Sequence, residues 1–500
     1  MTENLEILVQ NELFLLNLFQ LKEILNYING RFQPAASGNT MDNIKPSTGE
    51  IYGTIPESGV EDIAQAVNSA EKAFPLWKST PKEKRSAILF RLADLIKENL
   101  DELAMAEAID NGKPVSLAKA VDIPRAEANI RFYANAITQF SSEAHHMEIG
   151  AINYTLRKPI GIVGCISPWN LPLYLFTWKI APALAAGNCV IAKPSEVTPM
   201  TAYLLSKLAK EAGLPDGVLN VIHGTGPSAG DAIISHPKIK AISFTGGTKT
   251  GQYIAAKAAP EFKKLSLELG GKNPSIIFAD CDFDTMLDTT VRSSFANQGQ
   301  ICLCGSRIFV EEPIYEKFRE AFLEKVSKMR VGNPELPETK MGAVVSEQHM
   351  NKVLEFVDLA KEEGGTVLTG GVQVKLKGAL QGGFYIQPAI IEGLSFDCRT
   401  NQEEIFGPVV TIMPFKTEKE VLRYANSTKY GLSATIWTEN LSRAHRMAEQ
   451  IESGIVWINC WLLRDLRTPF GGVKNSGVGR EGGFEALRFF TEPQNVCVKY

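Results

Sequence analysis

Short apolar runs alternate with helical patterns along residues 159–271, and this alternation constrains the fold more than any other feature of the chain. The apolar runs cover residues 161–166, 189–192, 218–222 and 241–244, and the helical patterns cover residues 178–186, 200–211, 229–235 and 250–259. Strands that alternate with helices form a parallel sheet with helices on both faces. Ligands bind such sheets at the carboxyl ends of the strands, so the residues after each run are the first candidates for a site.

A second alternating region, residues 306–456, predicts another α/β domain. The fold class is therefore α/β, and 500 residues are enough for two or three domains. A helix start is predicted earlier in the chain, where Thr80 acts as the N-cap, Pro81 suits the first turn and Glu83 completes a capping box.

The composition argues against several classes of function. A net charge of -4 shows no basic surplus, so neither nucleic acid nor an anionic membrane is an expected partner. Eight cysteines spread over the chain, without a Cys-x-x-Cys pair, indicate neither a disulfide framework nor a zinc site. We expect reduced thiols, a cytoplasmic location and no metal.

The first 25 residues form an N-terminal extension of uncertain order. Residues 5–25 are leucine-rich, but acidic and amide residues interrupt the apolar pattern. This stretch has neither the basic leader nor the cleavage site of a signal peptide, and it is too polar to span a membrane. An extra amphipathic helix and an artefact of start-codon choice are both compatible with it.

Two stretches carry residues suited to covalent chemistry. Residues 294–304 place Cys302 after a helix end and a glycine-containing turn, and a thiolate is the most nucleophilic side chain near neutral pH. A single cysteine in an apolar setting is more often buried packing. Residues 265–274 place Glu268 in an apolar strand that breaks at two glycines. Burial raises the pKa of a carboxyl group toward neutrality, which suits a general base.

Together these stretches resemble the aldehyde dehydrogenase superfamily, with its Glu-Leu-Gly-Gly-Lys-Asn-Pro motif and its Gly-Gln-x-Cys nucleophile. The likeness extends from about Asn26 to the C-terminus. It implies a variant Rossmann NAD-binding domain over residues 26–145 and 160–268, a catalytic domain over 269–470, and oligomerisation strands over 146–159 and 484–500. It also implies that the tail pairs with a strand of a neighbouring subunit in a homodimer or homotetramer.

The resemblance assigns two cofactor contacts to a turn between a strand and a helix. There, Gly246 lets the backbone approach a ligand, and Thr248 offers donors at a helix N-terminus, beside the pyrophosphate. Lys193 and Glu196 follow another strand and would be a solvated turn by themselves. In the family they contact the adenosine ribose, and a carboxylate there repels a 2′-phosphate, which favours NAD over NADP.

The nicotinamide side is assigned by the same resemblance. Glu404 would hold the nicotinamide ribose, Phe406 would pack near the ring, and Trp169 is a further cofactor contact. Asn170 follows the first strand of the alternating region, where an amide can donate to an oxyanion, although a turn-forming asparagine is the likelier role for it in isolation. In the family pattern it pairs with the backbone amide of Cys302.

The implied mechanism begins when Cys302 attacks an aldehyde and Asn170 holds the oxyanion. Hydride transfer to NAD leaves a thioester, and Glu268 activates the water that hydrolyses it. Lys179 assists a proton relay or has a structural role. A thioesterase or thiol amidase could also use Cys302 and Glu268, and a structural, non-catalytic family member is the other alternative.

Two arginines bear on the substrate. Arg125 follows Pro124, and Arg464 precedes the 469–477 motif, in a segment that lines the substrate entrance in the family. Guanidinium groups bind carboxylates bidentately, so we expect an aldehyde with an acid at its far end. Residues 297–304 and 460–464 resemble the muconate semialdehyde dehydrogenases of the family. We expect 2-aminomuconate 6-semialdehyde from tryptophan catabolism, with the 2-hydroxy analogue of catechol meta-cleavage as the runner-up.

Overall fold

The computed structural model describes residues 22–500, and residues 1–21, which make up most of the predicted extension, lie outside the described residues. Strand β1 (Lys22–Glu23) falls within the predicted extension and pairs in parallel with β5 (Glu50–Pro56). Strand β4 (Thr40–Lys45) completes this small sheet. No helix among residues 22–500 is long and apolar enough to cross a membrane.

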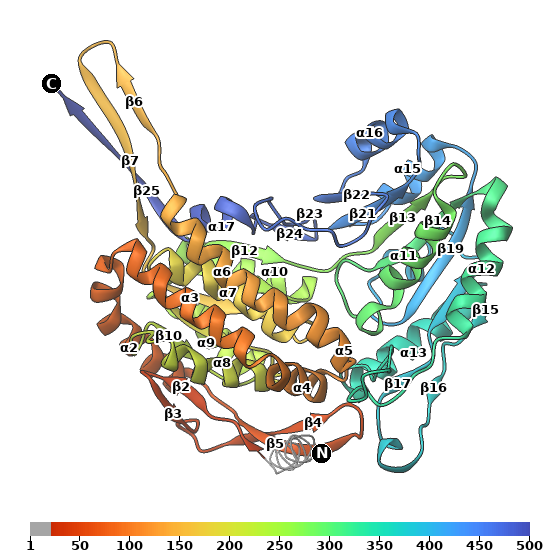
Figure 1. Cartoon of the computed structure of the whole chain (residues 1–500), viewed down its shortest axis with the longest axis horizontal. Coiled ribbons are helices and arrows are strands. Elements are labelled where there is room, and N and C mark those ends of the chain that lie inside the picture. The colour runs from red at the N-terminus through yellow and green to blue at the C-terminus, as the bar shows by residue number, and fades with distance from the viewer. Residues whose placement is uncertain (1–21) are drawn as a thin grey trace, which may run out of the picture.

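An eight-stranded sheet forms the first half of the molecule, and its central five strands are parallel, as predicted (Figure 1). These lie in the order β12 (Lys264–Glu268), β11 (Ile239–Thr245), β8 (Ile162–Ile166), β9 (Cys189–Lys193) and β10 (Leu219–Val221). The outer strands are β24 (Gly477–Val478), β2 (Asn26–Ile28) and β3 (Arg31–Gln33). The strand order reverses between β8 and β11, and a ligand crevice is expected there.

Some helices of this half, such as α7 (Pro172–Ala185), pack against the sheet, and α3 (Lys82–Glu98) and α6 (Ile123–Gln139) pack on other helices of this half. Helix α7 is apolar all round, and each of its 14 residues is buried. The others are α2 (Val60–Ser79), α4 (Leu100–Asn111), α5 (Val115–Leu117), α8 (Met200–Glu211), α9 (Asp231–Ser235) and α10 (Thr248–Ala258). The predicted cap of α3 is wrong, because Thr80 ends α2 and its hydroxyl donates to the Leu76 carbonyl.

A seven-stranded sheet forms the second half, and six of its strands are parallel. Their order is β15 (Thr366–Thr369, antiparallel), β18 (Ala389–Glu392), β19 (Val409–Phe415), β14 (Gly305–Glu311), β13 (Asn273–Ile277), β21 (Ser433–Trp437) and β22 (Ile455–Ile458). Its helices are α11 (Phe283–Phe295), α12 (Tyr315–Ser327), α13 (Glu347–Glu362), α14 (Arg399–Gln402), α15 (Glu418–Asn426) and α16 (Leu441–Gln450). Two short pairs, β16 (Gln373–Val374) with β17 (Tyr385–Ile386) and β20 (Tyr430–Gly431) with β23 (Val473–Lys474), complete this half. The chain passes from the first sheet to the second between Glu268 and Asn273.

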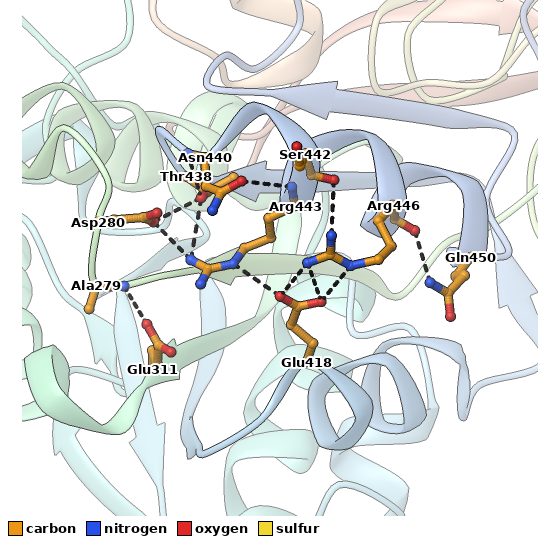
Figure 2. A network of polar contacts seen from close by, with 10 residues as sticks. All are labelled: Ala279, Asp280, Glu311, Glu418, Thr438, Asn440, Ser442, Arg443, Arg446 and Gln450. Carbon is orange, nitrogen blue, oxygen red and sulfur yellow. Dashed lines mark hydrogen bonds and ion pairs between the residues drawn. The ribbon is translucent and has the colours of Figure 1, made fainter.

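An ion-pair network ties helices α15 and α16 to the outer end of the second sheet (Figure 2). The Glu418 carboxylate accepts from the Arg446 guanidinium at 2.8 Å and from Arg443 at 3.2 Å. Arg443 also lies 3.1 Å from Asp280, which follows β13. These groups lie beyond the carboxyl ends of β13 and β21, whereas Cys302 lies before the start of β14, so the network stabilises the end of the sheet away from the nucleophile.

A three-stranded arm projects from the first half, with the C-terminus at its tip (Figure 1). It consists of β6 (Ala144–Met147), β7 (Ala151–Pro159) and β25 (Thr491–Lys499). The predicted pairing of the tail with a neighbouring subunit is wrong, because β25 pairs along its whole length with β7 of its own chain. Helix α17 (Gly483–Phe489) returns the chain to the base of β7, where Thr491 lies opposite Pro159.

Candidate active site

The nucleophile loop, residues 296–304, connects α11 to β14. Its backbone is left-handed at Asn297 (φ 52°) and Gln298 (φ 56°), a conformation that is uncommon for residues other than glycine. The amide of Gln298 holds this turn by donating to the Ala343 carbonyl at 2.6 Å. The turn leaves Cys302 half-buried just before β14 starts, on irregular backbone that a rigid scaffold supports.

Side-chain donors hold the backbone carbonyls on both sides of the thiol. The Nδ2 of Asn273 donates to the carbonyls of Cys302 at 2.7 Å and Cys304 at 2.9 Å. The indole Nε1 of Trp461 donates to the Leu303 carbonyl at 2.9 Å. With its carbonyls turned toward the protein, the loop is fixed at the residue that carries the thiol.

Asn170 lies beside this loop, as the sequence predicted. Its backbone carbonyl accepts from Lys113 Nζ at 3.1 Å and from Asn297 Nδ2 at 2.8 Å, so the turn after β8 is itself anchored. Its own Nδ2 donates to the Gln300 carbonyl at 2.9 Å. A carboxamide nitrogen carries two hydrogens, so one N–H of Asn170 remains available beside Cys302, where an oxyanion would form.

Glu268 ends β12, and the described residues offer neither of its carboxylate oxygens a hydrogen-bond partner. Burial raises its pKa well above the ordinary value, and the nearby charge of Glu481 adds to the rise. Glu481 is itself held by Lys179 Nζ at 2.9 Å and by the Ser243 hydroxyl at 3.1 Å. The structure therefore pairs Lys179 with Glu481 and leaves Glu268 a strong, unpaired base.

The environment of Cys302 keeps its thiol protonated in the absence of ligands. Burial raises the pKa of this thiol, and the charges of Glu404 and Glu268 raise it further. A carboxylate that destabilises the thiolate is also a base placed to accept the thiol proton, and Glu268 lines the same cavity as the sulfur.

Two cavities meet at Cys302. A cleft of about 240 Å³ on one side is lined by the predicted cofactor residues and the thiol: Trp169, Asn170, Gly246, Cys302, Glu404 and Phe406. A narrow cavity of about 40 Å³ on the other side includes Glu268, Arg464 and the same thiol in its walls. The sulfur can therefore be reached from one side by a cofactor and from the other by a substrate.

The turn after β11 suits a phosphate. Gly246 donates its N–H to the Glu268 carbonyl at 3.0 Å, and a Cβ on it would come within 2.4 Å of the Phe244 ring. Helix α10 begins at Thr248 without a side-chain cap, so its first N–H groups are available to an anion. The position after β11 is thus compatible with the pyrophosphate of a dinucleotide.

The predicted ribose residues lie at the end of β9: Lys193 is its last residue, and Glu196 lies in the turn that follows. Lys193 Nζ is 3.0 Å from the Glu196 carboxylate. Glu196 and Trp169 line a cleft of about 640 Å³, and Trp169 also lines the smaller cleft next to Cys302. Because the two clefts share Trp169, the site extends from the thiol toward the ends of β8 and β9.

Glu404 and Phe406 close the cleft from the second half of the molecule. Glu404 accepts from the Gly271 N–H at 2.9 Å, and a Cβ at Gly270 would lie 2.2 Å from its other oxygen. Phe406 has left-handed backbone (φ 64°), and its ring meets Trp169 edge-on at 5.3 Å. The residues present therefore fit a dinucleotide whose reactive ring reaches the thiol.

The two arginines flank one tyrosine. Arg464 Nη1 donates to the Tyr174 hydroxyl at 2.8 Å, and its guanidinium lies 3.9 Å from the centre of the Phe470 ring. Arg125 lies 5.6 Å from the centre of the Tyr174 ring. Only Arg464 of the two is among the residues that line the narrow cavity with Cys302.

Sequence reasoning missed several residues that build this site. Glu481 lies 302 positions from Lys179, and Trp461 lies 158 positions from Leu303, so no local pattern could have paired them. His349 Nε2, 2.7 Å from the Phe406 carbonyl, was missed for the same reason. Asn273 was visible within the Glu268 motif, but only the fold brings its amide to Cys302.

Comparisons with known proteins agree with this geometry. The model described as the aldehyde dehydrogenase family matches residues 32–496. A 2-aminomuconic semialdehyde dehydrogenase of Danio rerio is 50% identical over 478 residues, which cover 95% of this chain and 98% of that protein. A 2-hydroxymuconic semialdehyde dehydrogenase of Pseudomonas sp. (strain CF600) is 47% identical and covers 96% of this chain and 100% of its own. A solved structure titled as the NAD+ complex of an aldehyde dehydrogenase from Bacillus cereus has a TM-score of 0.94 at 39% identity, covering 97% of this chain and 98% of its own.

Proposed function

The chain belongs to the aldehyde dehydrogenase family, and on that premise we propose that it oxidises a semialdehyde whose far end is a carboxylate. It is an NAD-dependent oxidoreductase that acts on aldehydes. One observation carries the substrate proposal. Arg464, held by the Tyr174 hydroxyl, lines the same narrow cavity as Cys302 and Glu268, so a cation faces the path along which an aldehyde reaches the sulfur.

The first step is attack of the Cys302 sulfur on the aldehyde carbon. The thiol gives up its proton to Glu268 as the C–S bond forms. Glu481 lines the same cavity but is paired with Lys179, so Glu268 is the carboxylate available to accept that proton. The carbonyl oxygen becomes an oxyanion, which the free N–H of Asn170 stabilises together with the backbone N–H of Cys302. The product of this step is a thiohemiacetal on Cys302.

The cofactor residues hold NAD against this intermediate. Gly246 and Thr248 would contact the pyrophosphate, Lys193 and Glu196 the adenosine ribose, and Glu404, Phe406 and Trp169 the nicotinamide side. NAD, when bound, accepts the hydride that leaves the substrate carbon. The oxyanion collapses to a carbonyl at the same time, so Cys302 is left carrying a thioester.

Hydrolysis of the thioester depends on Glu268. Because its oxygens have no partner among the described residues and its pKa is raised, the deprotonated form is a strong base. Glu268 first releases to solvent the proton that it took from the thiol, and then takes a proton from water. The resulting hydroxide attacks the thioester carbon, the C–S bond breaks, and Glu268 returns its proton to the Cys302 thiolate as the carboxylic acid product leaves. The ion pair with Lys179 holds the Glu481 carboxylate in place near Glu268.

The preferred substrate in our proposal is 2-aminomuconate 6-semialdehyde, an intermediate of the kynurenine route of tryptophan catabolism. The 50% identity to a 2-aminomuconic semialdehyde dehydrogenase supports it, as does the expected pairing of Arg464 with the far carboxylate, with Arg125 nearby. The 47% identity to a 2-hydroxymuconic semialdehyde dehydrogenase favours the hydroxy analogue as the second candidate.

Other functions account for less of the site. A cysteine thioesterase would use Cys302 and Glu268 but would leave the cleft around Gly246 and Glu404 without a role. A non-catalytic family member would not need an unpaired, buried carboxylate at Glu268, which destabilises the fold.

We also propose a cytoplasmic homo-oligomer, with NAD-binding and catalytic domains divided near Glu268. All eight cysteines are free, as in a reducing compartment. The arm of β6, β7 and β25 exposes apolar side chains such as Ile149, Leu156 and Val498 and projects from the body (Figure 1). An exposed apolar arm is typical of a surface that a second subunit covers.

Steady-state kinetics with NAD test the substrate proposal. We expect the wild-type enzyme to prefer both muconate semialdehydes over an uncharged aliphatic aldehyde, and Arg464→Ala to raise KM for the acids about tenfold or more, from loss of a charged contact. Arg319→Ala is the matched control, because that half-buried arginine pairs with Glu392 away from the cavity. Equal use of the aliphatic aldehyde by the wild type would overturn the substrate, and the ratio of the two acids would choose between the pathways.

A further inference from the structure

The nucleophile loop and the entrance segment, residues 459–465, form two walls of the narrow cavity. Cys302 and Leu303 belong to the first wall, and Leu462 and Arg464 to the second. A substrate held by its carboxylate at Arg464 reaches Cys302 only if its length matches the separation of the two walls. The residues that set this separation therefore select substrates by the distance between their carboxylate and their aldehyde carbon.

One side chain connects the two walls directly. Trp461 belongs to the entrance segment, is only 4% exposed, and donates its indole N–H to the Leu303 carbonyl at 2.9 Å. The guanidinium of Arg292 lies 5.8 Å from the centre of its ring and covers it. The buried indole of Trp461 therefore joins the entrance segment to Leu303, the residue that follows Cys302.

The entrance segment has anchors of its own. Asn459 Nδ2 donates to the Thr438 carbonyl at 2.8 Å, and the Leu463 carbonyl accepts from Trp457 Nε1 at 2.9 Å. These contacts hold the segment to the end of β21 and to β22, whereas the indole N–H of Trp461 joins it to the nucleophile loop. Loss of the indole N–H should therefore change the distance between Arg464 and the thiol while each segment keeps its other anchors.

We propose that Trp461 is a positioning residue that sets the separation between Arg464 and the Cys302 sulfur, and so selects semialdehydes whose carboxylate lies at one distance from the aldehyde carbon. The inference rests on the proposed function, because it requires Arg464 to bind that carboxylate. It assigns Trp461 no contact with substrate, cofactor or the reacting atoms.

Trp461→Phe removes the N–H and keeps an aromatic ring. We expect its KM for 2-aminomuconate semialdehyde to rise about fivefold, the usual effect of one net hydrogen bond, while kcat/KM for an uncharged aliphatic aldehyde stays within about twofold. Trp77→Phe is the matched control, because that tryptophan is equally buried in α2 and its indole nitrogen has no partner among the described residues. Where the phenylalanine variant does not fold, 3-benzothienylalanine at position 461 replaces the N–H with sulfur and preserves the ring shape.

A double-mutant cycle decides whether Trp461 acts through Arg464. In the Arg464→Ala background, Trp461→Phe should change KM for the acid by less than about twofold, because the group it positions is already gone. The inference would be overturned if the fold-changes in KM of the two single variants multiply in the double variant. It would also be overturned if Trp461→Phe lowers kcat/KM equally for charged and uncharged aldehydes. If Arg464→Ala alone changes nothing, the carboxylate clamp of the proposed function fails first, and that outcome is recognisable before Trp461 is tested.

Discussion

The proposed nucleophile, Cys302, and the proposed general base, Glu268, line the same cavity, but the protein holds them in opposite ways. Around Cys302, the carbonyls of Gln300, Cys302, Leu303 and Cys304 each accept from a side-chain N–H. Glu268 has no hydrogen-bond partner for either oxygen among residues 22–500.

The difference follows from what each group must do. The sulfur has to meet the aldehyde carbon in one geometry, so its backbone is fixed from several sides. The carboxylate has to accept a proton and release it, and hydrogen bonds to its charged form would lower its pKa and weaken it as a base. Its lack of partners is unfavourable for stability and favourable for basicity.

The largest effect expected is that of Cys302→Ala. Without the sulfur no thioester can form, and we expect NADH production to fall at least about a thousandfold, as when other covalent nucleophiles are removed. Cys304→Ala is the control, because the loop uses the carbonyl of that residue and not its thiol. Aldehyde-dependent NADH production that survives in the Cys302 variant would show that the wrong cysteine has been assigned.

The next largest effect is that of Glu268→Gln, which keeps the shape and removes the charge. We expect kcat to fall about a hundredfold or more, the usual contribution of a general base. The pKa of Glu268 is raised, so its basic form is gained as pH increases, and wild-type kcat should rise with pH from acid through neutral. A glutamine variant with the wild-type pH profile would contradict the role of Glu268.

Asn273→Ala tests whether the anchored backbone around Cys302 is needed for activity. Loss of the amide frees the carbonyls of Cys302 and Cys304, and we expect kcat/KM to fall about tenfold for charged and uncharged aldehydes alike. Asn188→Ala is the control. Its amide also bridges two carbonyls, those of Ala183 and Phe490, but it lies away from the thiol.

The two asparagine variants should lose similar stability, about 1–3 kcal/mol each from unsatisfied buried carbonyls. Thermal or denaturant unfolding measures that loss, and kinetics measure the activity. If Asn188→Ala lowers kcat/KM as much as Asn273→Ala does, general destabilisation explains the effect and the anchor has no special role.

The smallest effect concerns Lys272, between Glu268 and Asn273. Its ammonium is buried, has no hydrogen-bond partner among the described residues, and burial lowers its pKa to about 7. Because the folded pKa is depressed, the unfolded chain binds more protons between pH 7 and the ordinary lysine value, and stability rises with pH across that range. Lys272→Met should therefore be more stable than wild type by about 1–3 kcal/mol at acid pH, and less so as pH rises. Denaturant unfolding at several pH values checks this, and a constant difference would contradict it.

Local patterns in the sequence were enough to select the proposed reacting groups, since Cys302, Glu268 and Asn170 each lie at or near the end of a predicted strand or helix. The parallel sheets were also predictable, because their strands and helices alternate visibly. The residues that hold the site in place could not be predicted, since pairs such as Trp461 and Leu303 meet only through the fold. Two predictions were wrong for different reasons. Thr80 has a competing local partner, because its hydroxyl donates to Leu76 in the preceding helix, and β25 pairs with β7 of its own chain, which only the fold shows.

The role of the two arginines in substrate binding stays a prediction. Arg125 and Arg464 both lie against Tyr174, although they are 339 positions apart. Only Arg464 lines the narrow cavity. Side-chain type could suggest a cationic site, but only packing shows which guanidinium lines the cavity.

The most direct test of the account is mass spectrometry of acid-quenched Glu268→Gln after it has been mixed with NAD and 2-aminomuconate semialdehyde. The account predicts one burst of NADH per active site, slower than in the wild type because glutamine cannot accept the thiol proton, and a thioester of the substrate on the peptide that contains Cys302. In the wild type it predicts continued NADH production without a stable adduct, because hydrolysis follows. Continued turnover of the variant would contradict the role of Glu268 as the base for hydrolysis. A burst with no adduct on Cys302 would contradict the role of Cys302 as the nucleophile.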